Sequence, residues 1–142
     1  MALYEEIGGY DMIHKVNKSF YDKVYQHPWL SQFFQHIPQE RIERQQTDFM
    51  VAAFGGPDMY MGREVIPAHL HIMITEEVYN LREQLLEEAF AEVKPPQKLV
   101  ERWRKIDLAF KNKIIKKSLD ECERKLRTEP VLDFPNPFKK VA

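Results

Sequence analysis

An all-α fold in one domain is the structure that this sequence predicts, on three observations. Apolar residues recur at steps of three and four through nearly every segment, and no stretch alternates as a half-buried strand does. Glycine and proline pairs interrupt the pattern where helix ends are expected. The 142 residues, of which 44% are hydrophobic and 30% charged, suffice for one core and are too apolar for disorder.

The first two helices are separated by a pair of glycines. Leu3–Ile7 form a short helix that Gly8-Gly9 stop, and Asp11 is expected to cap the second helix. This helix ends before Pro28, because the residue preceding a proline is pushed out of the helical region. Its apolar face consists of Ile13, Val16, Phe20 and Val24. A short aromatic turn then contains Trp29, Leu30, Phe33 and Phe34.

The third helix is delimited by proline and glycine. Pro38 suits its first position, since the fixed φ of proline fits there, and Gly55-Gly56-Pro57 is a strong stop signal. Its inner side carries Ile42, Gln45 or Gln46, Phe49, Met50 and Ala53. After a loop over residues 57–65, Pro67 starts a helix of one or two turns around His69.

Two more helices complete the predicted domain. Thr75 is expected to cap the first of them, and Lys94-Pro95-Pro96 breaks it. Its apolar stripe is Val78, Leu81, Leu85 and Leu86. The last helix is long, with one face formed by Leu99, Trp103, Ile106, Phe110 and Ile114, continued by Leu119, Cys122 and Leu126.

The C-terminal residues form a tail. We expect a domain over residues 1–128 and an extended tail over residues 129–142, because three prolines deny this segment a helix. Four apolar side chains among its prolines are too many for a solvated end. They are Val131, Leu132, Phe134 and Phe138. The tail is therefore expected to lie against the domain or a second copy of it, outside any pocket.

Composition and charge exclude several classes of protein. The formal net charge of -1 gives no basic stripe for nucleic acid, and the Lys/Arg-rich stretch 111–127 is interpreted as the solvated face of the last helix. No apolar run approaches ~18 residues and no charged segment precedes an apolar one at the N-terminus, so neither a membrane span nor a leader is expected. The single cysteine favours a reducing compartment. The expected location is the cytoplasm.

His69 is the most informative residue for function. A lone histidine is most often solvated or hydrogen-bonded, and zinc needs three or four ligands in a spacing that this chain does not show. On a helix His71 would point to the opposite side from His69, so only one of them is expected to face a given pocket. The layout is that of a haem pocket when His69 is taken together with Tyr21, Phe33-Phe34 and the two glutamines.

Several motifs, in order along the chain, resemble the truncated (two-over-two) haemoglobins, most closely their group I. They are the run Leu3–Gly9, the pairs Phe20-Tyr21 and Phe33-Phe34, Gln45-Gln46 with Phe49, Ala53–Pro57 with Tyr60–Arg63, and Ala68-His69. The resemblance covers residues 3–90 well and residues 91–115 more loosely. It implies a haem sandwiched between two antiparallel helix pairs, with a long C-terminal helix.

The resemblance also implies roles for individual residues. His69 would be the single protein ligand of the iron in haem b, and Phe34 would pack on the haem. Tyr21 would be the distal tyrosine, with Gln46 as its partner and Gln45 as the alternative inward glutamine. The remaining contacts implied with haem come from Ile42, where many larger globins carry a distal histidine, from Phe49, and from Arg63 or Arg44 as partners of the propionates.

One region departs from the group I pattern. The connection Leu70–Thr75 after the histidine is shorter than usual and resembles groups II and III. Those groups place a tryptophan on the following helix, where this chain has Asn80, Leu81 and Arg82. The resemblance therefore leaves the subgroup open.

The function implied is binding of dioxygen, nitric oxide or carbon monoxide at haem iron. Bound dioxygen carries partial negative charge, which a phenol and an amide both stabilise by donation, at about 1 kcal/mol for each hydrogen bond. The resemblance further implies conversion of nitric oxide plus dioxygen to nitrate, with a reductase as partner. The alternatives are a haem-based sensor or carrier acting through a protein partner, and a cofactor-free helical interaction module.

Overall fold

Six α-helices make up most of the computed structural model, which describes residues 2–60, 62, 64–123 and 130–138. They are α1 (Leu3–Glu6), α2 (Gly9–Gln26), α3 (Gln39–Ala53), α4 (Val65–His69), α5 (Glu76–Val93) and α6 (Gln97–Ile114), with 3-10 helices η1 (Leu30–Phe34) and η2 (Leu119–Glu121). The described residues include no strand, which agrees with the predicted all-α class.

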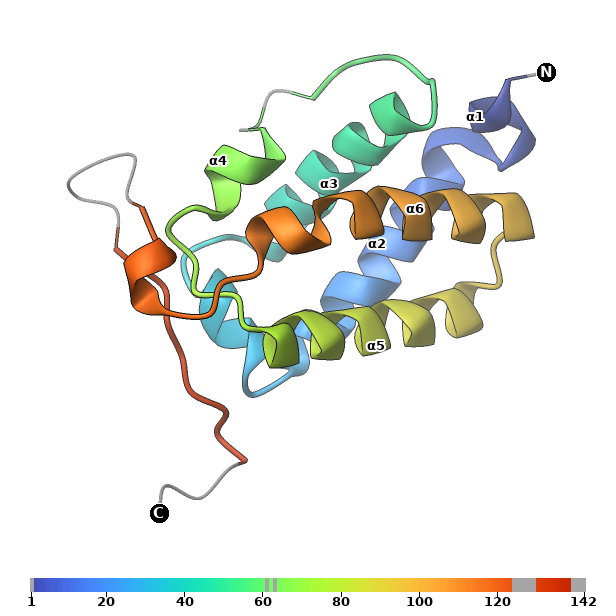
Figure 1. Cartoon of the computed structure of the whole chain (residues 1–142). Helices are drawn as coiled ribbons and strands as arrows, with labels where there is room; N and C mark the ends of the chain where they lie inside the picture. Colours follow the sequence, from blue (N-terminus) through green and yellow to red (C-terminus); the bar gives the residue numbers. More distant parts are fainter. Residues whose placement is uncertain (1, 61, 63, 124–129, 139–142) are drawn as a thin grey trace.

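The four long helices form two antiparallel pairs, one of α2 with α3 and one of α5 with α6 (Figure 1). Helix α2 packs against both α3 and α5 and so joins the pairs. The fully buried side chains come from these helices and from the residue after α1, and include Ile7, Ile13, Val16, Leu86 and Leu99. The predicted two-over-two helical sandwich is therefore confirmed.

Helix α2 begins two residues before the predicted cap. Gly8 and Gly9 both have positive φ, at 102° and 65°, and Gly8 occupies the N-cap position. A glycine adopts this left-handed backbone without steric cost, so the turn itself sets the helix start. Asp11 lies in the first turn and makes no capping hydrogen bond, which corrects its predicted role.

Other helix ends follow the sequence signals closely. Thr75 Oγ1 accepts a hydrogen bond from the Val78 N–H at 3.1 Å, as predicted for the cap of α5. Lys94 ends α5 in a left-handed conformation with φ 56°. Pro38 is the N-cap of α3 rather than its first residue, and α4 begins two residues before Pro67.

Helix α6 ends at Ile114, earlier than predicted. Ile115 is extended, and the Lys116 N–H donates to the Ile74 carbonyl at 2.8 Å, which turns the chain towards α5. Lys116 is 7% exposed, so the interpretation of residues 111–127 as a solvated helix face is wrong at this lysine. Leu119 lies in η2 instead of continuing the helix, and Leu126 is outside the described residues.

The described part of the tail, residues 130–138, lies against the helical body. Leu132 forms an isolated parallel bridge with Ile72, with hydrogen bonds of 2.8 Å from the Met73 N–H and 2.9 Å to the His71 carbonyl. Trp29 Nε1 donates to the Phe134 carbonyl at 2.7 Å. The tail therefore connects the segment after α4 with the residues around η1.

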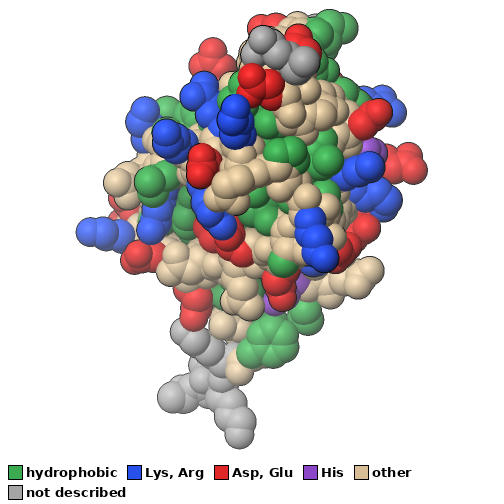
Figure 2. Space-filling model, turned by 90° about the vertical axis from the view of Figure 1, so that its right-hand side faces the viewer, with side chains coloured by type: hydrophobic (Ala, Val, Ile, Leu, Met, Phe, Trp, Pro, Cys, Tyr) green, Lys and Arg blue, Asp and Glu red, His purple; other side chains and the backbone are tan. Residues whose placement is uncertain are grey.

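The surface shows no segregation of charge on the face in Figure 2, where acidic and basic side chains are interspersed. Ion pairs between helices include Arg104 with Glu87 and Lys98 with Glu6. In the described part of the chain, no helix is long and apolar enough to cross a membrane.

Candidate functional site

A cavity of about 640 Å³ lies between the helix pairs and is lined by residues from α2, η1, α3, α4, α5 and α6. Its size is typical of sites that hold small organic ligands or cofactors. The structure brings together at this cavity seven of the nine site residues named from the sequence: Tyr21, Phe34, Ile42, Gln45, Gln46, Phe49 and His69. Arg63 lies outside the described residues, and Arg44 is exposed and does not line this cavity.

His69 is the last residue of α4 and is oriented by its own helix. Its Nδ1 lies 2.6 Å from the Val65 carbonyl oxygen. Because a carbonyl only accepts, Nδ1 carries the proton and Nε2 keeps its lone pair. Burial, the largest effect, lowers the pKa of His69, and the Val65 hydrogen bond partly opposes it. The imidazole is therefore neutral and oriented as metal-ligating histidines usually are.

Tyr21 contributes a polar group from α2. The side chain is 6% exposed and makes edge contacts with the rings of Phe20 and Phe34, at centroid distances of 4.8 and 6.0 Å. Its hydroxyl has no hydrogen-bond partner among the described residues. Burial raises the pKa of Tyr21 well above its usual value, so the phenol remains a neutral donor at physiological pH.

The His69 imidazole and the Tyr21 phenol indicate whether the residues of the cavity suit a haem. His69 Nε2, like the Tyr21 hydroxyl, has no hydrogen-bond partner in the described part of the chain, and both residues line the same cavity. Aromatic and aliphatic side chains, among them Phe34 and Phe49, form much of its wall. A flat apolar cofactor with an iron at its centre meets all three features, so the residues fit the group.

The two glutamines of α3 both line the cavity and both are half-buried. The described residues offer neither amide a hydrogen-bond partner. Both candidates for the inward glutamine, Gln46 and Gln45, therefore lie at the site.

His71 also lines the cavity, which corrects the expectation that only one of the two histidines faces it. The prediction assumed a helix through both residues, but α4 ends at His69 and the chain turns. The alternation of faces along a helix no longer applies beyond that residue.

The tail likewise reaches the cavity. Leu132, held by its bridge with Ile72, is one of the lining residues. The expectation that the tail stays outside the pocket is therefore wrong. The cause is the early end of α6, which leaves the side of the cavity near Ile72 to be covered by the extended chain.

A charged pair that was not predicted from the sequence lines the cavity: Arg82 on α5 and Asp107 on α6, whose Nη1 and Oδ2 atoms lie 2.9 Å apart. A signal for it exists in the sequence. Arg82 falls four residues after Val78, on the apolar stripe of its helix, and Asp107 falls four residues after Trp103. A charge on a buried stripe indicates either a partner or a site.

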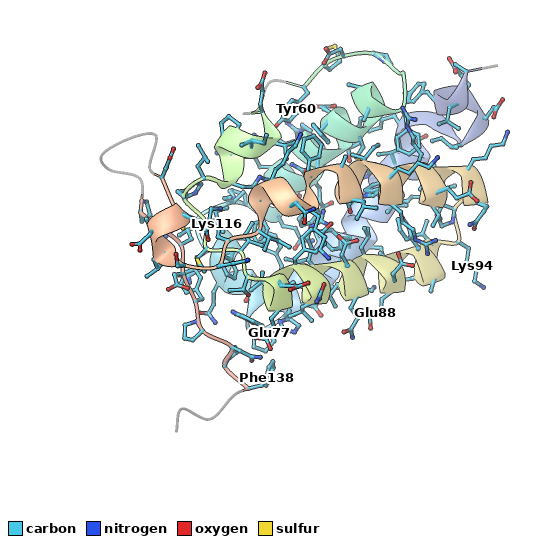
Figure 3. The ribbon with its side chains drawn as sticks, viewed as in Figure 1. Tyr60, Glu77, Glu88, Lys94, Lys116 and Phe138 are labelled. Carbon is cyan, nitrogen blue, oxygen red and sulfur yellow. The ribbon has the colours of Figure 1, made fainter. Side chains whose placement is uncertain are left out.

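Lys116 is a second missed residue. Its ammonium donates to the carbonyl oxygens of His69 and Ile72, each at 2.7 Å, and to that of Ile114 at 3.3 Å. Figure 3 labels this lysine where the chain leaves α6. Burial lowers the pKa of Lys116. The lysine thus links the ends of α4 and α6.

The helix order, the two antiparallel helix pairs and a cavity with an imidazole oriented by its own helix define a two-over-two globin. The model of the family described as bacterial-like globin matches residues 2–115. The chain belongs to this family. Membership implies haem-based binding of small ligands, gases among them.

Known relatives agree with this assignment. The chain is 32% identical over 80 residues to a group 1 truncated haemoglobin of Mycolicibacterium paratuberculosis, covering 56% of this chain and 59% of the relative. It is 33% identical over 68 residues to that of Tetrahymena pyriformis, covering 48% of this chain and 56% of the relative. The matched segments thus span little more than half the length of these curated relatives.

Solved structures have the same fold. The 2/2 haemoglobin of a Synechococcus species, solved with covalently attached haem, superposes with a TM-score of 0.72 at 26% identity, covering 81% of this chain and 98% of the other. A group II truncated haemoglobin of Bacillus anthracis superposes with a TM-score of 0.68 at 21% identity, covering 82% and 92%. Similar structures therefore include both group II and group 1 proteins.

Proposed function

We propose that the chain binds haem through Nε2 of His69 and holds dioxygen with Tyr21 as the main donor. The observation that carries this proposal is that two polar groups, each without a hydrogen-bond partner among the described residues, line one apolar cavity. The imidazole nitrogen would bind the iron, and the phenol would donate to the ligand.

The distal donors differ in how firmly they are placed. Tyr21 is packed between aromatic rings on a buried helix face. A glutamine must give up side-chain rotamer freedom to reach the ligand. We therefore assign Gln46 a secondary role, with Ile42, Phe34 and Phe49 as apolar contacts. Arg63 remains our candidate for a propionate partner.

The cofactor proposed is haem b, which carries no thioether link. Cys122 is the only cysteine and does not line the cavity. A single free thiol also fits a reducing compartment, and we place the protein in the cytoplasm.

The proposed reaction combines nitric oxide, dioxygen and one electron to give nitrate. Haem supplies the iron that binds the gas ligand and provides that electron, and a reductase restores it. The protein's own contribution is to orient the ligand and to supply hydrogen-bond donors in a pocket of low polarity.

Absorption spectra of the ferric, ferrous and carbonyl forms test haem binding directly. The native protein should show a Soret band, and His69→Ala should lose haem or change its ligand field. His36→Ala, at an exposed histidine, should keep the native spectrum. Retention of the native spectrum in His69→Ala together with its loss in His71→Ala would transfer the ligand role to His71.

Gas-binding kinetics and turnover test the remaining steps. Tyr21→Phe should speed dioxygen dissociation by roughly tenfold or more, since a hydrogen bond to a charged acceptor is worth ~1.5–3 kcal/mol. Gln46→Leu should act in the same direction but less. Consumption of nitric oxide with a reductase present identifies an enzyme, whereas its absence in a protein that binds dioxygen and carbon monoxide favours a sensor or carrier.

A further inference from the structure

Arg82 brings a positive charge to a cavity whose described lining is mostly aromatic and aliphatic but also includes Arg41 and Asp107. It lines the cavity from α5, and its guanidinium carbon lies 5.2 Å from the centroid of the Phe20 ring. Phe20 directly precedes Tyr21 on α2. The guanidinium thus packs on the ring of the residue that precedes the proposed distal donor.

All ion pairs that Arg82 makes with described residues involve one guanidinium nitrogen, Nη1. Nη1 donates to Asp107 Oδ2 at 2.9 Å and to Glu83 Oε1 at 2.5 Å. No acceptor among the described residues bonds to Nε or Nη2. Because a guanidinium is planar and presents five N–H groups in a fixed fork, anchoring Nη1 fixes the direction of the others.

The charge of Arg82 acts on the phenol of the proposed site. It lowers the pKa of Tyr21, against the larger effect of burial, and Asp107 opposes this effect. Arg82, Tyr21 and His69 line the same cavity, so the guanidinium borders the space in which a ligand would lie.

We propose that Arg82, held by Asp107, is a hydrogen-bond donor to small monovalent inorganic anions in this pocket, of the class of nitrite, azide and fluoride, and that it raises the affinity of the pocket for them. This inference rests on the proposed haem site. The two carboxylates at Nη1 hold the guanidinium in place, and its N–H groups at Nε and Nη2, which bond to no described residue, act as directed donors. Such donors form strong hydrogen bonds with anionic acceptors and weak ones with neutral diatomic gases.

The test compares anionic and neutral ligands on one set of variants. Azide and fluoride affinities are measured by titrating the ferric haem-loaded protein, and carbon monoxide affinity is measured on the ferrous protein. Arg82→Leu should weaken both anions by tenfold or more and change carbon monoxide affinity by less than threefold. Arg82→Lys, which keeps the charge but loses the fork, should fall between Leu and the native residue.

Arg104→Leu is the matched control. Arg104 also lies over a phenylalanine ring, that of Phe90, and pairs with a carboxylate of α5, that of Glu87, but it does not line the cavity. Its replacement should leave both anion affinities within twofold of native. Since Arg82→Leu leaves Asp107 without its partner, the double variant Arg82→Met/Asp107→Leu removes both charges and keeps the test available if the single variant does not fold.

The outcomes separate this inference from the proposed function. Anion affinities within twofold of native in the Arg82 variants, in a protein with a Soret band, would overturn the anion site alone. Equal losses for anions and carbon monoxide would also overturn it, because they indicate a general change in the pocket. A native protein without a Soret band would overturn the haem site and the anion site together.

Discussion

Lys116 Nζ lies 2.7 Å from the carbonyl oxygen of His69, the residue that we propose as the iron ligand. The carbonyl belongs to the last residue of α4, where helix carbonyls lack partners within the helix. A cation is favourable at this end of a helix dipole. Lys116 therefore completes a short helix that offers little stability of its own.

Replacing this lysine should destabilise the protein and loosen the proposed haem ligand. Lys116→Met leaves the His69 and Ile72 carbonyls without this donor, at an expected cost of about 1–3 kcal/mol. Urea unfolding measures the cost, and transfer of haem to an acceptor apoprotein should be faster. Lys117→Met, at the exposed neighbour, is the control. Equal stability of the two variants would show that the buried ammonium contributes nothing.

Leu132 should matter more than its place in a tail suggests. Leu132→Ser removes an apolar side chain that lines the cavity, and we expect a loss of about 1–2 kcal/mol with faster haem release. Thermal unfolding and haem transfer are the measurements. Val131→Ser, at a side chain 39% exposed, should change neither. Matching effects at the two positions would indicate that the tail stabilises the protein only through its backbone hydrogen bonds and not through the Leu132 side chain.

The helices could be predicted from sequence because their signals are local. The period of three and four, the cap at Thr75 and the break at Lys94-Pro95-Pro96 depend on residues within a few positions of each other. The cavity residues Tyr21, Ile42 and Phe49 follow once the inner faces are known.

What the sequence could not predict depends on distant partners. Lys116 is one of several lysines near the end of α6, and only the folded chain brings the carbonyls of His69 and Ile72 to it. The residues that follow Ile114 were therefore predicted to continue the last helix. Arg82 was similarly ambiguous, because its partner Asp107 is 25 residues away on another helix.

The hydrogen bond between Asn17 and Thr47 should couple α2 to α3. Asn17 Nδ2 donates to Thr47 Oγ1 at 3.1 Å, and the two residues are 2% and 0% exposed. Thr47→Val leaves the amide without this acceptor, so we expect a loss of about 1–3 kcal/mol. A double-mutant cycle with Asn17→Leu, followed by urea unfolding, should give a combined loss smaller than the sum. Strict additivity would mean that the bond adds no stability.

One buried and one half-buried tyrosine should make the protein lose stability at alkaline pH. Burial raises the pKa of both Tyr25 and Tyr79 to about 12, with smaller contributions from Glu43 and Glu83 respectively. An unfolded tyrosine ionises near pH 10. Between about pH 10 and 12 the unfolded chain therefore releases protons that the folded chain retains, and the free energy of unfolding falls as pH rises.

Tyr25→Phe isolates this effect. The variant loses the 2.7 Å hydrogen bond from the hydroxyl to the Ile37 carbonyl, so it should be less stable than the native protein at pH 8. It also has no proton to release at this position, so its stability should fall less steeply between about pH 10 and 12. Tyr10→Phe, at a side chain 40% exposed, should keep the native slope. Urea unfolding at a series of pH values measures both slopes, and a native slope in Tyr25→Phe would assign the alkaline loss to other groups.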